Sequence, residues 1–329
     1  MRIIRDLSEL SDPLENTVVT IGNFDGVHLG HREIFRRVVA RAHRIGGTSV
    51  VFTFVPHPLK VLDPQRAPRL INSYAEKERL IEASCIDVLV CTPFTREFAA
   101  ISASRFVEKI LVGKLGVRHM IVGYDYAFGR HREGDLPFLQ RKGDEFGFSV
   151  EELQPISADS TVYSSTRIRR MLMNGEVAEV VGFLGRHYTV EGLVVGGEQR
   201  GKTIGFPTAN LQTEKDLLPK PGVYAVKVKR GESLHDGVVN IGSKPTFGTE
   251  GFSVEVHILD FSEDIYGENL RLYFIERLRD EVPFPSVEAL VKRISSDVEK
   301  ARQILRESRV IEYREYLRDS CAPGEEGES

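Results

Sequence analysis

The 329-residue chain contains no tryptophan, only three cysteines and no strong excess of either charge. Three irregularly spaced cysteines are too few for a disulfide framework or a zinc site. The net charge of −4 argues against a general nucleic-acid binder, which normally carries a basic face. No apolar run approaches the about 18 residues that a membrane span needs, and the first residues lack the apolar core of a signal peptide. These absences predict a cytoplasmic protein without membrane or nucleic-acid partners.

The composition predicts a globular protein with two ordinary domains, because 41% of the residues are hydrophobic and 28% are charged. Residues 1–183 alternate β-rich runs with helical stretches, which is typical of a parallel α/β sheet. In residues 184–316 the strands are linked by turns, which predicts a small antiparallel barrel or sandwich. Residues 317–329 are acidic and have little to bury, so we expect a disordered tail.

Hydrophobic periodicity places ten strands and two well-marked helices. A helix after residue 30 has an apolar stripe and ends at a Gly-Gly pair. The last helix has Ser286 as its N-cap. Its expected buried stripe is Val287, Leu290, Val291, Ile294, Val298, Ala301 and Leu305. The expected strands are 18–21, 49–54, 87–91, 119–122 and 148–153 in the first half, and 188–195, 223–228, 237–241, 253–261 and 270–278 in the second.

The most informative segment is the H-L-G-H sequence that contains His28, Gly30 and His31. It follows an apolar strand and a glycine-bearing turn with Asn23 and Asp25, and it opens a helix. The first amides of a helix are unpaired and its dipole is positive there, so this arrangement suits phosphates. Gly30 has no Cβ, which lets a ligand approach the backbone. The two imidazoles can donate hydrogen bonds to a triphosphate and stabilise a departing pyrophosphate.

A second segment of the first half also offers groups for a nucleotide. Ser164, Ser165 and Thr166 lie at the start of a helix, where hydroxyls and amides suit phosphates, and Arg169 can pair with an anionic oxygen. The same Ser-Ser-Thr sequence is equally typical of helix capping. Asp125 lies in an aromatic loop, G-Y-D-Y-A-F-G, whose alternative role is packing on the sheet.

In the second half, residues 196–210 join a glycine-rich loop to a proline turn. Its G-K-T triplet lacks the spacing of a Walker P-loop. The loop offers backbone amides and cationic groups for phosphates, followed by hard oxygen ligands suited to Mg²⁺. The alternative is a β-turn that is merely rich in glycine. The candidate binding residues are Gly197, Lys202 and Thr203, and the candidate metal ligands are Thr208 and Asn210.

These motifs, in this order from about residue 17 to about residue 301, resemble those of the bacterial bifunctional riboflavin kinase/FAD synthetases. The resemblance implies a Rossmann-like nucleotidyltransferase domain with a parallel sheet, then a small antiparallel β-barrel flavokinase domain with a C-terminal helix. The barrel would convert riboflavin and ATP to FMN and ADP. The first domain would convert FMN and ATP to FAD and diphosphate.

The resemblance also implies roles for individual residues of the first domain. His28 and His31 would stabilise the ATP phosphates, and the S-S-T-x-x-R segment would close over them. Asp125 would contact the nucleotide or its metal. His57 lies in a segment similar to the family's P-H-P loop, although Val55 stands where an acidic or polar residue is frequent. His57 therefore suits loop packing as well as it suits ligand contact.

In the second domain, G-F-P-T-A-N resembles the flavokinase motif, in which Thr208 and Asn210 bind Mg²⁺ and the phosphates of ATP. Glu255 lies on a strand similar to the one that carries the family's general base, which takes a proton from the ribityl hydroxyl. Glu268 is a competing carboxylate in a turn. Arg277 and Arg279 match positions near the flavin and could contact the FMN phosphate, although either also suits surface charge.

Two alternatives stay open. The chain could retain only one of the two activities, or the barrel could be a flavin-binding regulatory module that does not phosphorylate. Thr208, Asn210 and Glu255 together argue against a pure sensor, which would not need all three. An aminoacyl-tRNA synthetase, which shares H-x-G-H, fits poorly because no K-M-S-K-S-type loop is present.

Overall fold

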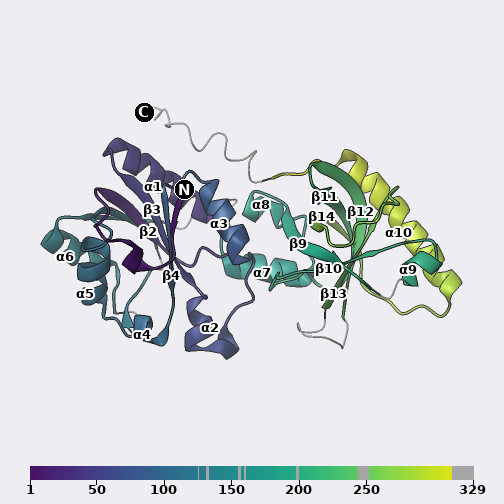
Figure 1. Cartoon of the computed structure of the whole chain (residues 1–329), viewed down its shortest axis with the longest axis horizontal. Coiled ribbons are helices and arrows are strands. Elements are labelled where there is room, and N and C mark those ends of the chain that lie inside the picture. The colour runs from purple at the N-terminus through teal and green to yellow at the C-terminus, as the bar shows by residue number, and fades with distance from the viewer. Residues whose placement is uncertain are drawn as a thin grey trace. The chain divides into compact units, whose positions relative to one another are not determined.

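The computed structural model describes residues 1–124, 126–130, 133–154, 157–158, 161–197, 200–243 and 252–312. The chain divides into two compact units after Ser165, and each is described by itself. The first unit is a sheet flanked by helices, and the second is a barrel with a long helix (Figure 1). Within the described residues, no helix is both long and apolar enough to span a membrane.

The first unit contains a six-stranded parallel sheet in the order β1-β4-β3-β2-β5-β6. All five expected strands are present, which confirms the parallel α/β prediction. The additional edge strand β1 was missed because three residues carry too little alternation to detect. The strands are β1 (Arg2–Ile4), β2 (Thr17–Ile21), β3 (Thr48–Val55), β4 (Val88–Pro93), β5 (Val117–Gly123) and β6 (Ser149–Leu153).

Helices cover both faces of this sheet, because successive side chains of a strand point to opposite faces. Val19 and Phe52 pack in one core cluster, and Val18 and Val51 pack in the other, with the apolar stripe of α1. The helices are η1 (Leu7–Glu9), α1 (Leu29–Arg44), α2 (Pro58–Leu62), η2 (Pro64–Arg66), α3 (Tyr74–Glu82), α4 (Arg96–Ala99), α5 (Ala103–Phe106), the π-helix η3 (Val107–Val112) and α6 (Leu136–Phe146). The short hairpin β7 (Ser157–Ala158) and β8 (Thr161–Val162) follows.

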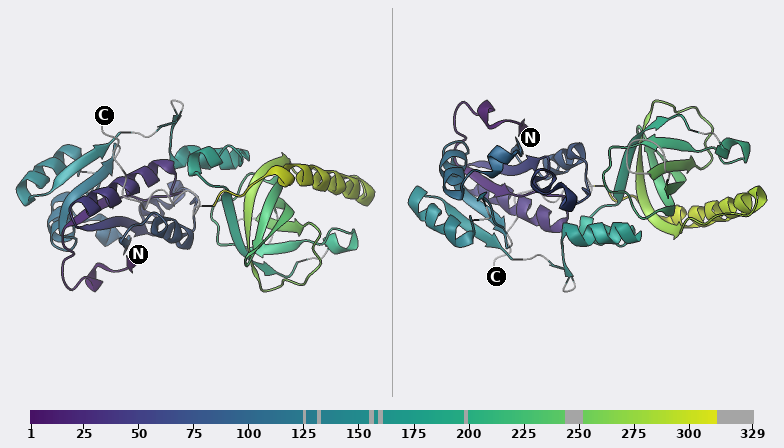
Figure 2. Two further views of the ribbon diagram at one scale, coloured as in Figure 1. Left: turned by 90° about the horizontal axis from the view of Figure 1, so that it is seen from above. Right: turned by 90° about the horizontal axis from the view of Figure 1, so that it is seen from below.

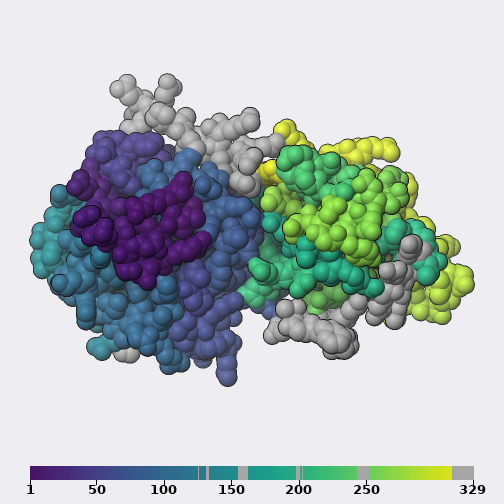
Figure 3. Space-filling model, viewed as in Figure 1, coloured from purple at the N-terminus to yellow at the C-terminus, as the bar shows by residue number. Residues whose placement is uncertain are grey.

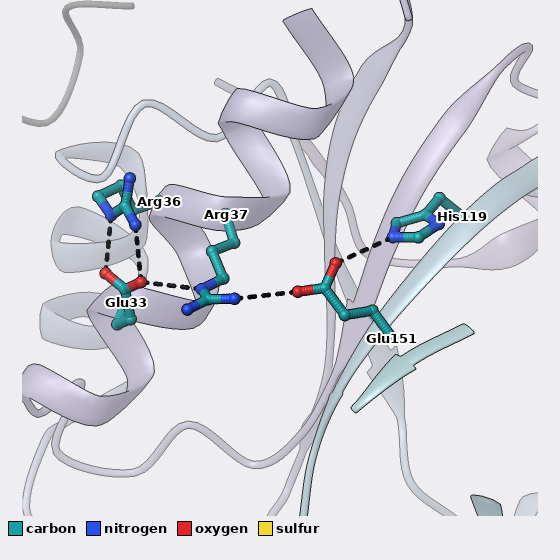
Figure 4. Close-up of polar contacts among 5 residues, drawn as sticks. All are labelled: Glu33, Arg36, Arg37, His119 and Glu151. Carbon is teal, nitrogen blue, oxygen red and sulfur yellow. Dashed lines mark hydrogen bonds and ion pairs between the residues drawn. The ribbon is translucent and has the colours of Figure 1, made fainter. Parts of the chain in front are cut away.

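A chain of polar contacts ties α1 to the edge of the sheet (Figure 4). Glu33 pairs with Arg36 and Arg37 on the helix, and Arg37 reaches Glu151 of β6 at 3.1 Å. Glu151 lies 3.4 Å from the buried imidazole of His119 on β5. These contacts hold the helix whose first turn carries the H-L-G-H sequence.

The second unit is a closed antiparallel barrel in the order β10-β13-β12-β11-β14-β9, seen from two sides in Figure 2. The prediction of a barrel is confirmed. Strand β10 was missed because four residues beside a proline turn show no clear alternation. The strands are β9 (Tyr188–Val195), β10 (Ala209–Gln212), β11 (Gly222–Arg230), β12 (Ser233–Ser243), β13 (Phe252–Ile258) and β14 (Asn269–Arg279). The helices are α7 (Ser165–Asn174), α8 (Val181–Leu184), α9 (Arg200–Thr203) and α10 (Val287–Glu307).

The long helix α10 begins after Ser286, whose hydroxyl accepts a hydrogen bond from the N–H of Ala289 at 3.2 Å, as expected. The prediction of a buried stripe along its whole length is wrong in the first half. Val287 is 56% exposed, whereas Ala301 and Leu305 are fully buried against the outer face of the barrel. Atoms of α10 (yellow) are visible at the surface of the second unit in Figure 3.

Candidate functional site

The H-L-G-H segment forms the first turn of α1, where the two histidines lie against each other. His28 is the N-cap, and its Nδ1 accepts a hydrogen bond from the N–H of His31 at 3.3 Å. The two rings are stacked with their centroids 3.6 Å apart. A Cβ on Gly30 would lie 3.2 Å from the His28 ring and 3.4 Å from Cβ of Tyr163. Glycine at this position therefore leaves room for the stacked pair.

The environment of His31 favours the neutral imidazole. Burial lowers the pKa of His31 well below its ordinary value, and the nearby His28 and Lys77 lower it further. Its Nδ1 is buried and has no hydrogen-bond partner among the described residues. A neutral imidazole offers one donor and one acceptor, and a neighbouring anion favours its protonation. The protonation of the histidine pair can therefore change when a phosphate binds nearby.

Asp25 links the turn after β2 to two other segments of the first unit. Its buried carboxylate accepts hydrogen bonds from the N–H groups of Ile71, at 3.0 Å, and Asn72, at 3.4 Å. The hydroxyl of Ser165 donates to the carbonyl oxygen of Asp25 at 2.8 Å. The structure thus brings the S-S-T segment against the turn that precedes the H-L-G-H sequence.

Lys77, on α3, is a site residue that the sequence reasoning missed. Its buried ammonium donates to the hydroxyl of Thr53 at 3.0 Å and to the carbonyl oxygen of Asn23 at 3.3 Å. Burial lowers the pKa of Lys77, and the negative charge of Asp25 opposes that shift. One signal was present in the sequence: Lys77 lies three residues before the buried Leu80, on the apolar face of its helix.

A small pocket adjoins these groups. Its lining includes Asn23, Asp25, Asn72 and Lys77, together with His57. The imidazole of His57 caps α2, because its Nδ1 accepts a hydrogen bond from the N–H of Leu59 at 3.2 Å. His57 therefore has a structural contact in the loop and also borders the pocket, so both roles considered for it stay possible.

The other expected residues of the first half that the structure describes lie in α7 or just before it. Ser164 is half-buried before α7, Thr166 is exposed, and Arg169 is half-buried within the helix. Asp125 lies outside the described residues. The aromatic side chains that follow it, Tyr126 and Phe128, have ring centroids 5.6 Å apart and pack against a core cluster.

In the barrel, three polar residues form a row across neighbouring strands. Glu255 of β13 is paired in register with Asn210 of β10 on one side and with Asn240 of β12 on the other. Directly opposite residues of an antiparallel pair lie on the same face. Asn240 was not expected. It donates to Glu281 at 3.3 Å, and only the barrel register brings it beside Glu255.

The glycine-rich loop approaches the side chain of Asn210 closely. A Cβ on Gly197 would lie 2.0 Å from Nδ2 of Asn210, so a side chain there would displace the carboxamide. The hydroxyl of Thr208 lies 3.3 Å from where a Cβ of Gly201 would be. Thr208 and Asn210 thus present hard oxygen atoms beside two glycines of the loop, Gly197 and Gly201, which fits Mg²⁺ that also binds phosphates. Among the described residues, no cluster of three or more His, Cys, Asp or Glu could hold a metal by itself.

Lys202 and Thr203 lie in the single turn of α9, which forms part of the same loop. Of the two candidate carboxylates, Glu268 is engaged in a bidentate ion pair with Arg230, with distances of 2.7 and 2.9 Å. That pair lowers the pKa of Glu268. A carboxylate held in this way is poorly suited to accept a proton, which argues against Glu268 as a general base.

The two arginines considered for phosphate binding both have protein partners. Arg277 donates to the carbonyl oxygen of Pro221 at 3.0 Å and to Asp280 at 2.7 Å. Arg279 pairs at 2.7 Å with the buried carboxylate of Asp297 on α10. These contacts give both side chains a structural role in the ligand-free protein.

Comparisons with known proteins match both halves of the chain. The family model for FAD synthetase matches residues 10–167, and that for riboflavin kinase matches residues 184–305. Relatives named bifunctional riboflavin kinase/FMN adenylyltransferase include one from Escherichia coli K12, 37% identical over 92% of this chain and 97% of its own. Another, from Pseudomonas fluorescens, is 38% identical over 92% of this chain and 98% of its own.

A solved structure from Streptococcus pneumoniae, named a macrolide-efflux protein, has a TM-score of 0.82 and 33% identity. The match covers 91% of this chain and 98% of that one. Its fold is thus shared over nearly the whole length, although its name describes another activity. The two family models and the relatives that span both of them lead to one conclusion. The chain belongs to the family of bifunctional riboflavin kinase/FMN adenylyltransferases.

Proposed function

We infer that the chain is a bifunctional enzyme of flavin cofactor synthesis. Its C-terminal part phosphorylates riboflavin with ATP, giving FMN and ADP. Its N-terminal part transfers AMP from ATP to FMN, giving FAD and diphosphate. The observation that carries this inference is the presence of two separate constellations in one chain: the stacked His28–His31 pair at a helix N-terminus, and the Asn210–Glu255 pair on the barrel. The functional domains that we propose are residues 1–183 and 184–316, with an acidic tail at 317–329.

In the adenylyl transfer, an oxygen of the FMN phosphate attacks the α-phosphorus of ATP. The bond from that phosphorus to the bridging oxygen breaks, and diphosphate leaves. The protein needs mainly to position the two substrates and to stabilise the charge that builds on the leaving group. His28 and His31 perform this second task at the start of α1, and Gly30 lets the phosphates approach the backbone. Asn23 and Asp25 hold the turn in place.

Further nucleotide contacts in this domain come from the S-S-T-x-x-R segment and the aromatic loop. The hydroxyl groups and the guanidinium of the S-S-T-x-x-R segment suit the phosphates of ATP. The hydrogen bond from Ser165 to the turn after β2 supports this placement, because it brings the start of the segment beside the H-L-G-H sequence. The residues that we propose here are Asp125, Ser164, Ser165, Thr166 and Arg169.

In the kinase reaction, Glu255 takes the proton of the ribityl hydroxyl while the oxygen attacks the γ-phosphorus of ATP. The bond from that phosphorus to the bridging oxygen breaks, and ADP leaves. Thr208 and Asn210 would hold Mg²⁺, which supplies charge neutralisation on the ATP phosphates when bound. The loop that contains Gly197, Lys202 and Thr203 contacts the nucleotide. Arg277 or Arg279 contacts the phosphate of FMN. We further propose that the enzyme works in the cytoplasm on small-molecule substrates only.

A chromatographic time course with riboflavin, ATP and magnesium tests this function. FMN should appear first and FAD should follow, and a chelator such as EDTA should stop both steps. A reaction that halts at FMN would leave only the kinase and contradict the assignment of the H-L-G-H site. Conversion of supplied FMN to FAD, without any conversion of riboflavin, would favour the alternative of a flavin-binding regulatory barrel.

A further inference from the structure

Asn72 presents a buried carboxamide that has no hydrogen-bond partner among the described residues. The residue is only 4% exposed, and both Oδ1 and Nδ2 of its side chain are unsatisfied. Its backbone N–H is held by the carboxylate of Asp25 at 3.4 Å. A buried polar group without a partner destabilises a fold, so its presence calls for an explanation. A ligand that completes these hydrogen bonds is one such explanation.

A small pocket adjoins the side chain of Asn72. Asn72 lines it together with the apolar side chains of Phe54 and Leu70 and the ring of Tyr74. Lys77 lies in the same lining, and two of its three N–H groups are used by Thr53 and Asn23. Apolar and aromatic walls with a few convergent polar groups are typical of sites for small organic ligands.

The donors and acceptors identify the chemistry of the ligand. A carboxamide places an acceptor beside a donor in one plane, which matches a ring edge that carries an N–H next to a carbonyl oxygen. Apolar walls suit the flat faces of such a ring. A phosphate fits less well, because it would leave the acceptor Oδ1 unmatched and would lie close to the carboxylate of Asp25. FMN carries an imide edge of this kind, and the adenine of ATP has a related donor–acceptor edge.

The sheet topology separates the starting points of the segments that we propose for these two substrates. Strands β3 and β5 pair with opposite sides of β2. The pocket is formed by the turn after β2, the end of β3 and the connection that follows it. The S-S-T segment that we propose for the ATP phosphates follows β6, beyond β5. The pocket thus lies beside β3, whereas the segment proposed for the ATP phosphates comes from the other side of β2 and meets the turn through the hydrogen bond from Ser165 to Asp25.

We propose that Asn72 is a specificity-determining residue that recognises the imide edge of the isoalloxazine ring of FMN by hydrogen bonding. This inference rests on the proposed adenylyltransferase function and assigns one of its substrates to the pocket. The carboxamide pairs with the imide N–H and its neighbouring carbonyl, and the ammonium of Lys77 is close enough to line the same space. Asn72 is then left unsatisfied only while FMN is absent.

The test uses the full chain with the near-isosteric variant Asn72→Leu. With FMN and ATP, we expect its KM for FMN to rise roughly tenfold, since the pairing is lost, while its KM for ATP stays unchanged. The Tm of the ligand-free protein should stay the same or rise, because an unsatisfied buried group has been removed. A purely structural asparagine would instead give a lower Tm.

Two controls test whether the effect is specific to the imide edge and to Asn72. FMN methylated at the imide nitrogen should be a poor substrate for the wild type, whereas Asn72→Leu should no longer distinguish it from FMN. The variant Asn174→Leu, at an exposed asparagine that donates to Glu176, should change neither KM. An unchanged KM for FMN, or a rise in the KM for ATP alone, would overturn the proposal. A wild type that makes no FAD would instead contradict the proposed function itself.

Discussion

The imidazole ring of His28 stacks on that of His31, with the two ring centroids 3.6 Å apart at the start of α1. His28 also accepts a hydrogen bond from the backbone of His31, so each residue helps to position the other. The pKa of His31 is held low partly by the neighbouring His28. The two histidines therefore act as one unit, and we expect the effects of replacing them to be far from additive.

Replacement of either histidine should separate the two activities. We expect His28→Ala and His31→Ala each to lower FAD formation about 100-fold or more, by analogy with the loss of one charge-stabilising donor. FMN formation from riboflavin should stay largely intact, because the kinase residues lie on the barrel. Separate chromatographic assays with FMN and with riboflavin measure both effects. Loss of both activities in a folded variant would contradict the assignment to two sites.

Gly30→Ala tests the close packing around the stacked pair. A Cβ at this position would lie 3.2 Å from the His28 ring, so the ring must shift by a few tenths of an ångström. We expect FAD formation to fall roughly tenfold, because transferring groups tolerate little misplacement. Gly182→Ala, in α8, where no atom lies within 4 Å of the added Cβ, is a control for the general effect of a methyl group at a helical glycine. Equal activities of the two variants would argue against a role for the pair.

The two carboxylates of the barrel should behave differently. Glu255→Gln should stop FMN formation yet leave FAD synthesis from supplied FMN, because only the proton acceptor is lost. Glu268→Gln should leave kinase activity within a few-fold of the wild type and cost at most about 1 kcal/mol of stability, as expected for a partly exposed ion pair with Arg230. Initial rates with riboflavin and urea unfolding test these expectations. A greater loss of kinase activity in Glu268→Gln would identify the other carboxylate as the base.

The pair between Arg279 and Asp297 should anchor α10 to the barrel. Both side chains are largely buried, at 13% and 6% exposure. Asp297→Ala leaves the guanidinium buried without its main partner, so we expect a loss of about 3 kcal/mol in the free energy of unfolding. Urea unfolding measures this loss. FAD formation from FMN, which depends on the other unit, should be unchanged before the unfolding transition and serves as the control.

Stability should fall as the pH falls below the ordinary histidine pKa of 6.5. Burial lowers the pKa of His31, His119 and His187 in the folded chain. The unfolded chain therefore binds more protons between 6.5 and those lower values, and stability rises with pH across that window. The Tm at pH 7.5 should exceed that at pH 5.5, and His119→Gln should weaken this dependence. A Tm that is equal at both pH values would contradict the neutral state of these residues.

Tertiary structure decided which polar side chains come together at the candidate sites. Lys77 and Asn72 come from α3 and the connection before it, and they meet the turn after β2 only because that connection folds back over the end of the sheet. Glu255 and Glu268 are both carboxylates in the sequence; the barrel register places Glu255 beside Asn210, whereas Glu268 forms an ion pair with Arg230. Such contacts join residues that are distant in the chain, so no local pattern encodes them.

The sequence by itself determined five strands of the parallel sheet, five strands of the barrel and the start of α1, because periodicity, caps and glycine turns act over a few residues. It also placed His28, Gly30 and His31 at a helix N-terminus. Only the tertiary structure decided that Val287 is exposed while Leu305 is buried, since the apolar stripe of α10 is longer than the barrel face that covers it. Burial depends on which other segments pack against a surface, and the sequence of one helix does not contain that information.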